Sequence, residues 1–458
     1  MSIEKIISLL FCISLFISLP AGAATKDQPL EIPAVWTVRE AVRFAKANSP
    51  DSRLTRQRIL AAQAMVDQAR SAFYPQVGIS TQYSQTDNPM YSFGNILNQG
   101  VFSQAIDFND PGRTDDLSAE AVVQYRLYNG GGNSAGLAMA EAGRTAVEMD
   151  YATLQGRLAY EVVRAFFTIV QARDTLQARQ SELESIGAAV EVARARHAAG
   201  DLLRTELLNL EVQESGAREN LIRAEHGLEL AQRGFLNLLG LENITVSLDT
   251  TEDGVAQPVS QQAQGRRSEL QSLEAMVQAA EARLAQAESG RYPTADLFAS
   301  YRLDSGFETD GSGSSWMGGV KLSYNLFDGH RTGAAIAEAQ ARLAEVRAQQ
   351  RKLELAVNLE IEQARLALNQ AEASLKVTGK MVELASENAR LTRERFKEGV
   401  VLSSDLIDVE NRLTDAQVRL ALAKAARRIA LADLRRAVGL PQFEQTIGRE
   451  MQSAPVEK

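Results

Sequence analysis

Leu127-Tyr128-Asn129-Gly130 recurs as Leu326-Phe327-Asp328-Gly329, which places the glycines at 130 and 329 at a separation of 199 residues. Two further pairs keep that spacing: RHAAG at 196–200 with RFKEG at 395–399, and LGL at 239–241 with VGL at 438–440. Self-similarity at a fixed offset is the signature of a structural repeat. The chain is therefore predicted to contain two copies of one unit, with no insertion across the interval that these pairs span.

The spacing changes upstream of these pairs. Tyr74-Pro75 matches Tyr292-Pro293 at an offset of 218, so the first copy carries 19 additional residues between Pro75 and Leu127. Residues 86–117 are rich in Asn, Asp, Gly and Pro, which predicts a longer loop in the first copy. Because this stretch contains several aromatic residues, we expect it to pack against another part of the protein. They are Tyr91, Phe93, Phe102 and Phe108.

The repeat and the flanking composition predict the domain organisation. It consists of a signal peptide at 1–23, a first strand–helix repeat at 36–241, a polar linker at 242–266, a second repeat at 267–440 and a C-terminal tail at 441–458. A short strand is expected near the start of the linker, at 244–248.

The N-terminal segment has the pattern of an export signal. Residues 6–19 form an apolar run of 14 residues, too short to span a bilayer as a helix. The small residues Ala21-Gly22-Ala23-Ala24 follow and provide a cleavage site, although an N-terminal membrane anchor is the alternative interpretation. The only cysteine, Cys12, lies in this segment after Phe11, which argues against a lipid-modified terminus. The mature chain is thus expected to have no thiol chemistry.

Charge and hydropathy exclude some classes of function. The formal net charge is −9, which gives no electrostatic reason to bind nucleic acid. After residue 23 no run of 18 apolar residues occurs, so no membrane-spanning helix is expected. If the chain crosses a membrane, it must therefore use strands.

Two proline-free windows predict long helices. Residues 134–199 and 332–398 are rich in helix-forming residues, and 66 residues would extend roughly 100 Å. Shorter helices are expected at 52–73 and 204–239. Between 353 and 375 apolar residues advance by three or four, as in a coiled coil, and a second stripe (Leu355, Leu359, Leu366) lies on another face. Two stripes indicate neighbours on both sides, as in a cylinder of helices; an ordinary bundle is the alternative.

Four segments of about ten residues alternate apolar and polar side chains, two in each copy. The apolar sets are Val77, Ile79, Thr81 and Tyr83; Ala121, Val123, Tyr125 and Leu127; Ala295, Leu297, Ala299, Tyr301 and Leu303; and Trp316, Val320, Leu322, Tyr324 and Leu326. Asp296, Arg302 and Lys321 all fall on the polar set. Such segments suit tilted strands with lipid outside and water inside. Four strands cannot close a barrel, so the chain must oligomerise, and a trimer with twelve strands leaves more room for a lumen than a dimer.

Together these features resemble the TolC-like outer-membrane efflux protein family, over about residues 36–440. The most specific motifs are the paired strand-to-helix turns and the paired glycine tips. The resemblance implies an α+β membrane protein: a homotrimer with a twelve-stranded barrel in the bacterial outer membrane, in contact with its lipid, and a tunnel of long coiled-coil hairpins across the periplasm. It further implies a passive conduit for an efflux or type I secretion system. The expected partners are a periplasmic adaptor protein and an inner-membrane transporter.

The resemblance places the periplasmic hairpin tips at Gly200 and Gly399, where glycine between two long helices also fits a left-handed C-cap. Asp405 and Asp408 are three residues apart, hence on one helix face. They match the acidic rings of the family's periplasmic aperture, where three copies of each would favour cations. In the first copy Glu206 and Asn209 take these positions. The alternative is a solvated helix face whose acids are favoured by the helix dipole.

The tips also depart from the family. Phe396 stands where a Tyr is common, and Val401 stands where an Arg can occur. The polar network that holds the family's tips closed is therefore incomplete at these two positions. We hypothesise that Arg204 substitutes for it by pairing with the acidic tips, where the resemblance also places adaptor docking.

No catalytic or cofactor motif is present. The three histidines, His197, His226 and His330, are widely separated and do not form a metal site of recognised spacing. The glycine-rich segment 129–133 lacks the Lys-Ser/Thr of a phosphate loop. We therefore expect no enzyme, no cofactor and no bound metal. A periplasmic coiled-coil scaffold or adaptor with a soluble β-domain is the alternative to a channel, and within the channel class drug efflux, metal efflux and protein secretion remain open.

Overall fold

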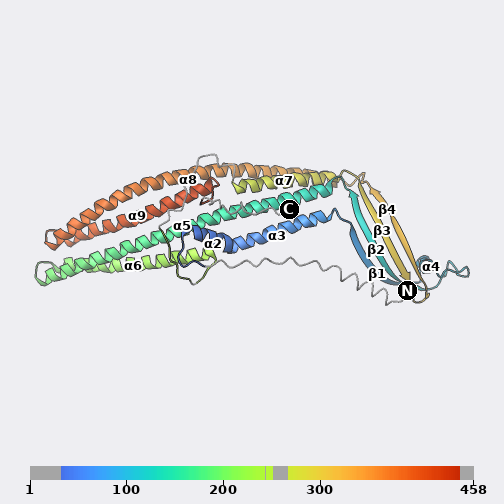
Figure 1. Cartoon of the computed structure of the whole chain (residues 1–458), viewed down its shortest axis with the longest axis horizontal. Helices are drawn as coiled ribbons and strands as arrows, with labels where there is room; N and C mark the ends of the chain where they lie inside the picture. Colours follow the sequence, from blue (N-terminus) through green and yellow to red (C-terminus); the bar gives the residue numbers. More distant parts are fainter. Residues whose placement is uncertain (1–31, 243, 251–266, 444–458) are drawn as a thin grey trace, which may run out of the picture.

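The computed structural model describes residues 32–242, 244–250 and 267–443. The predicted signal peptide, most of the linker and most of the C-terminal tail lie outside these residues. In chain order the elements are α2 (Val38–Asn48), α3 (Pro50–Ser71), β1 (Gln76–Thr86), α4 (Pro89–Asn98), β2 (Thr114–Tyr128), α5 (Gly132–Ala198), α6 (Arg204–Leu239), α7 (Ser268–Ser289), β3 (Thr294–Ser305), β4 (Ser312–Ser323), α8 (Arg331–Lys397) and α9 (Ser403–Ala437). The fold is elongated, with the helical hairpins at one end and the sheet at the other (Figure 1).

The element bounds confirm the internal repeat. The long helices α5 and α8 each have 67 residues, and α3 and α7 each have 22. The side-chain contacts follow the same register. Arg194 pairs with Glu211 between α5 and α6 (3.3 Å), and Arg393 pairs with Glu410 between α8 and α9 (2.6 Å, Nη2 to Oε2). Each residue of the second pair lies 199 positions after its counterpart, so the two hairpins are built alike.

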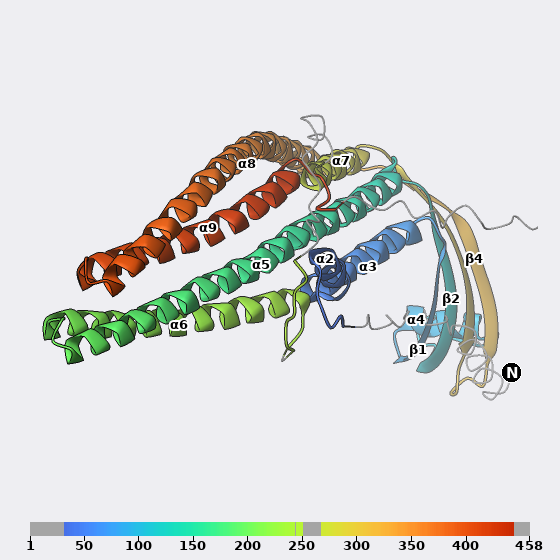
Figure 2. The same cartoon turned by 60° about the vertical axis from the view of Figure 1, so that its left-hand side comes forward.

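Each hairpin consists of one long helix and one shorter helix. α6 packs along α5, α9 packs along both α8 and α5, and α3 and α7 continue the shorter helices toward the sheet (Figures 1 and 2). The predicted coiled-coil seam of α8 is buried at Val357, Ile361 and Ala364, because it faces α9. The second stripe, Leu355, Leu359 and Leu366, is exposed in the single chain. That stripe has no neighbour within the described residues.

The largest core lies midway along the helices, where α2 crosses α5 and α6. Trp36 is fully buried there and contacts Phe44 and Phe235 edge-to-face, at ring-centroid distances of 5.3 and 6.1 Å. The strand expected at 244–248 is limited to one parallel bridge between Trp36 and Leu248. The backbone of Trp36 makes both hydrogen bonds of this bridge, with Ser247 O (2.8 Å) and Asp249 N (2.9 Å), and Val246 and Leu248 are buried in the same core.

The sheet has the strand order β1-β2-β3-β4, with every neighbouring pair antiparallel. Two expectations need correction. β4 ends at Ser323, so Tyr324 and Leu326 lie in the turn toward α8 rather than in the strand. The segment 86–117 is not only a loop, because it contains helix α4 and the first residues of β2. Pro89 and the capping side chain of Asn88 start that helix within a polar stretch that contains no long apolar period.

Within the described residues, no helix combines the length and the apolar character that crossing a bilayer requires.

Candidate functional site

One face of the sheet is apolar and open to its surroundings. The register aligns Ile79, Ala121, Tyr301 and Trp316 in one row across the four strands. Trp316 is 80% exposed, and Val77, Val320 and Leu322 on the same face are also exposed. A soluble protein rarely leaves so large a continuous apolar surface uncovered. The alternation predicted from the sequence therefore places a lipid-compatible surface on one side of the sheet.

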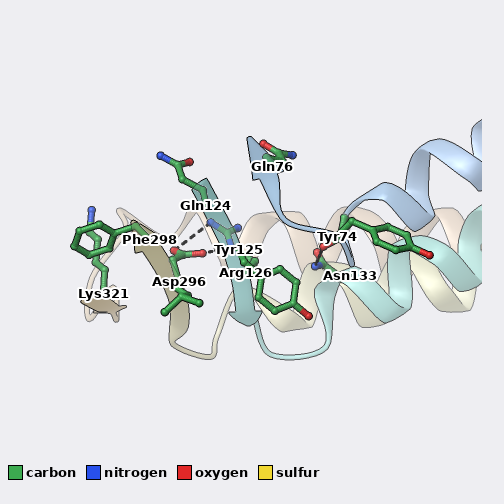
Figure 3. Close-up of a pocket in the computed structure, with 11 residues that line it drawn as sticks. Tyr74, Gln76, Gln124, Tyr125, Arg126, Asn133, Asp296, Phe298 and Lys321 are labelled. Atoms are coloured by element: carbon green, nitrogen blue, oxygen red, sulfur yellow. Dashed lines mark hydrogen bonds and ion pairs between the residues drawn. The ribbon is translucent and has the colours of Figure 1, made fainter. Parts of the chain in front are cut away.

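The opposite face is polar and charged. Arg126, Asp296 and Lys321 form one cross-strand row, in which Arg126 Nε donates to Asp296 Oδ1 at 2.7 Å. Gln76 and Gln124 form the adjacent row, near the end of the sheet that joins the helices. Figure 3 shows these side chains lining a hollow at that end, with Tyr74 and Asn133 on its helical side. Paired charges of this kind suit a face of the sheet that is in contact with water.

The strand-to-helix turns join the sheet to the long helices by backbone geometry that few residues adopt. Gly130 and Gly329 have φ of 64° and 66°, and Gly131 and His330 follow at 83° and 68°. At Gly130 a Cβ would also overlap the backbone of Ser289, so glycine is required there for space as well. The helices that follow are capped in the same way in both copies. Asn129 Oδ1 accepts from Asn133 N (3.2 Å), and Asp328 Oδ2 accepts from Thr332 N (2.9 Å).

The hairpin tips are at the opposite end of the molecule, where Gly200 and Gly399 have φ of 85° and 79°. A single apolar cluster, here called the tip core, joins the two hairpins. Its buried members are Ile186, Ala189, Val190 and Ala193 of α5, Leu207 and Leu210 of α6, Phe396 of α8 and Leu406 of α9. Phe396 is only 1% exposed, and Val401 packs against the cluster from its edge. The two positions that depart from the family therefore form apolar contacts between the hairpins.

Arg196 strengthens this junction, although the sequence reasoning did not single it out. Its Nη1 donates to the carbonyl oxygen of Phe396 (3.0 Å), and its guanidinium lies 5.5 Å from the centroid of the Phe396 ring. A cation over an aromatic face is attracted to the ring's quadrupole. The signal that could have found it is its place four residues before Gly200, within the motif shared by both copies.

The residues assigned to the aperture fall into two groups. Glu206 is partly buried, and its Oε2 accepts a hydrogen bond from Ser403 N at 2.8 Å, between the hairpins. Asp405, Asp408 and Asn209 are exposed, and Asp408 pairs with Arg412 one turn further along α9 (2.9 Å). Arg204 is exposed too, and in the described part of the single chain it forms no ion pair.

The described residues contain no group of three or more His, Cys, Asp or Glu side chains arranged to hold a metal ion. The three histidines are far apart in the fold, and the ring Nδ1 of His197 is 2.8 Å from the carbonyl oxygen of Leu202.

Comparisons with known proteins agree with this architecture. The family model described as outer membrane efflux protein matches residues 41–241 and 259–440. The outer membrane protein TolC of Vibrio cholerae is 25% identical over 411 residues, which cover 85% of this chain and 88% of that protein. Protein CyaE of Bordetella pertussis is 25% identical, over 84% of this chain and 80% of its own length. A membrane protein from Pseudomonas aeruginosa has the same fold, with a TM-score of 0.78 at 20% identity and coverage of 88% and 93%.

The chain combines a four-stranded sheet, apolar on one face and charged on the other, with two equivalent helical hairpins. With the matched family and relatives, this defines a channel protein of the outer membrane that extends into the periplasm. The chain belongs to the outer membrane efflux protein family. Its function is that of the outer-membrane channel component of an efflux or secretion system, rather than that of a periplasmic scaffold. Its relatives are channel proteins, not enzymes.

Proposed function

We propose that three copies of this chain assemble into a continuous passive conduit from the periplasm to the exterior. The observation that carries the proposal is the pair of free edges on the sheet. β1 and β4 are its outer strands, and four alternating strands leave them antiparallel to one another. β4 of one subunit can therefore pair with β1 of the next in ordinary antiparallel fashion. Such pairing removes every open edge, as a lipid environment requires, and gives twelve strands from three chains.

The helices support the same assembly. The exposed stripe Leu355, Leu359 and Leu366 on α8 continues a helical period, so it suits a second helix packed alongside. A neighbouring subunit would cover it, and twelve helices from three chains would continue the barrel as a tunnel. Residues 1–23 would be removed on export.

The hairpin tips are the proposed periplasmic aperture and docking site. Asp405 and Asp408 are exposed on α9 directly after the Gly399 turn, and three copies would place six carboxylates around the entrance. The exposed tip surface around Gly200, Arg204 and Gly399 would contact a periplasmic adaptor protein, which links the channel to an inner-membrane transporter. In this proposal the inner-membrane transporter delivers the substrate, and the channel provides the passage to the exterior.

Internal symmetry supports an acidic partner for Arg204. Glu206 of the first hairpin bonds the backbone of Ser403 in the second. The residues 199 positions away are Asp405 and Arg204, so the next junction around the ring would bring Asp405 of one subunit to Arg204 of its neighbour. This contact would give Arg204 the role proposed from the sequence, in which it pairs with the acidic tips and helps to hold them closed.

The experiment is a mass measurement and a conductance measurement on the protein purified in detergent from outer membranes. We expect a mass of three chains and cation-selective channels in planar bilayers. Asp405→Asn with Asp408→Asn should reduce the cation selectivity, read as the reversal potential in a KCl gradient, since the aperture charge is lost. Asp415→Asn, an exposed acid paired with Arg419 further along α9, is the matched control. A stable monomer without channel activity would refute the assembly.

A further inference from the structure

Helix α4 lies on the polar face of the sheet, at the end farthest from the helices (Figure 1). Asn95 Nδ2 donates to Thr114 Oγ1 (3.1 Å), and Gln99 Nε2 donates to Asp116 Oδ1 (3.3 Å). Thr114 and Asp116 are an even number of residues from Arg126 along β2. Since side chains of a strand alternate between its faces, both point to the same side as the charged row.

A second strand fixes the position of α4. A Cβ at Gly313 of β4 would overlap the carbonyl oxygen of Asn98, so the helix end lies directly on that strand. Gly313 pairs with Asp304, which again belongs to the polar face. α4 therefore spans from β2 to β4 across the polar face.

The turn between β3 and β4 holds the same segment. The Thr309 hydroxyl donates to Gln99 Oε1, and Gln99 is only 1% exposed. Asp115 accepts hydrogen bonds from the backbone nitrogens of Phe307 and Glu308, at 3.0 and 2.8 Å. Buried polar groups with matched partners specify one geometry. The segment is a fixed structure, rather than a loose loop.

The other side of α4 is apolar and uncovered. Ser92 and Ile96 are buried on the side of α4 that carries Asn95 and Gln99, whereas Met90 and Leu97 are 78% and 50% exposed. At 100° per residue, Met90 and Leu97 lie on the face opposite the sheet. An aromatic cluster flanks this face, with Phe93 at 4.6 Å from Phe108 and 5.8 Å from Phe102 (ring centroids). Phe93, Phe102 and Phe108 thus pack on one another beside α4, whereas Tyr91 is 64% exposed, so the expected packing against another part of the protein is not what these rings show.

The dimensions of a twelve-stranded barrel indicate what would cover the exposed apolar face of α4. Twelve strands about 4.8 Å apart and tilted by about 40° close into a cylinder with a radius of about 12 Å. A helix packed on the inner face is itself about 10 Å wide, so its far side reaches the barrel axis. Three such helices, one from each subunit, must contact one another.

We infer that the three α4 helices meet at the outer mouth of the barrel and narrow it with an apolar constriction of Met90, Leu97 and the flanking aromatic rings. The occupant of the exposed face is thus α4 of the other two subunits. This inference rests on the proposed trimer. The channel then has a second constriction, at the exterior end, which impedes ions because an apolar ring holds water poorly.

Cysteine cross-linking tests the contact directly. The only cysteine is Cys12, so a Cys12→Ser background carrying Leu97→Cys presents one thiol per chain. A disulfide requires Cα atoms within about 7 Å of each other. If the α4 helices contact one another, oxidation should therefore convert most chains to covalent dimers. Val320→Cys, on the opposite, apolar face of β4, is the matched control and should remain monomeric on denaturing gels. A trimeric Leu97→Cys protein that does not cross-link would overturn the inference, whereas absence of the trimer would refute the proposed assembly instead.

Conductance tests the constriction. Met90→Asp with Leu97→Asp places charges only at exposed positions, so folding should be unaffected, and we expect single-channel conductance to rise by about two-fold or more as the apolar ring becomes wet. Val320→Ala should leave it at the wild-type value. Unchanged conductance in the double variant would contradict a constriction at α4.

Discussion

Glu206 and Ser403 connect the two hairpins although 197 residues separate them: the Glu206 carboxylate accepts the backbone N–H of Ser403 at 2.8 Å. Ser403 is the first residue of α9, whose initial N–H groups have no partner within the helix. A carboxylate at a helix N-terminus satisfies one of them and interacts favourably with the helix dipole. Glu206 of the first hairpin thus caps a helix of the second.

Loss of this cap should loosen the closed tips. Glu206→Ala is expected to cost about 1 kcal/mol at the junction and to lengthen the open time of single channels. Glu206→Gln should have a smaller effect, because its amide oxygen still accepts the hydrogen bond. Glu219→Ala, which breaks an exposed pair with Arg223, serves as the control. Equal open times in Glu206→Ala and wild type would show that the cap does not hold the tips.

The proposed contact between Arg204 and the Asp405 of a neighbouring subunit predicts a rescue. Arg204→Asp should place two acids together and raise channel conductance. Arg204→Asp combined with Asp405→Arg should return conductance toward the wild-type value, since the pair is restored with reversed charges. Arg204→Ala alone tests whether Arg204 pairs with the acidic tips at all. If Arg204→Ala left conductance unchanged, the pairing would be wrong.

Phe396 is predicted to be a structural residue of the tips. Phe396→Ala should destabilise the tip core by about 3 kcal/mol or more, because it leaves a cavity between both hairpins. Hydrogen exchange should then accelerate in 186–210 and 396–407 and remain unchanged at α3. Phe396→Tyr should also be destabilising, because a hydroxyl would be buried among apolar side chains. A Phe396→Tyr protein with more closed channels and normal stability would favour a gating role instead.

The stability of the junction between α7, α8 and α9 should decrease at acidic pH. Arg267, 4% exposed, bonds Glu269 Oε1 (2.8 Å), Glu360 Oε2 (2.8 Å) and the carbonyl oxygen of Ala437 (3.2 Å), and so ties α7 to α8 and α9. Burial alone would raise the pKa of Glu269, but hydrogen bonds and the charge of Arg267 outweigh it and lower that pKa below 4.5.

A lowered pKa fixes the sign of the pH dependence. The stabilising contribution of Glu269 is present in full above its unfolded value of about 4.5 and is lost as pH falls through the lower folded value. The wild-type protein should unfold at a higher temperature than Glu269→Gln at pH 7, and the difference should shrink below about pH 4. A difference that stays constant between pH 7 and pH 3 would contradict this assignment.

Local sequence patterns were sufficient for the elements and their repetition. Proline-free windows and the turns at Gly200 and Gly399 placed the long helices within one or two residues, because helix periodicity and left-handed glycines are properties of neighbouring residues. Alternation also assigned the two faces of the sheet correctly. Alternation wrongly extended the last strand to Tyr324 and Leu326. It does not show where hydrogen-bonded pairing with the neighbouring strand ends.

Contacts between distant segments required the tertiary structure. The sequence placed Phe396 and Val401 in a polar gate that lacked its hydroxyl and its guanidinium, whereas the fold packs both in the tip core. It assigned Glu206 to the aperture but did not show that its carboxylate bonds the backbone of Ser403 in the other hairpin. It described 86–117 as a loop, whereas α4 is held by a hydrogen bond from Thr309 to Gln99, 210 residues apart. The sequence by itself determined the repeat, the helices and the two-faced strands, because these follow from periods of two to four residues. Only the tertiary structure decided which residues join the hairpins and cover the sheet, because those partners meet through folding and leave no local period.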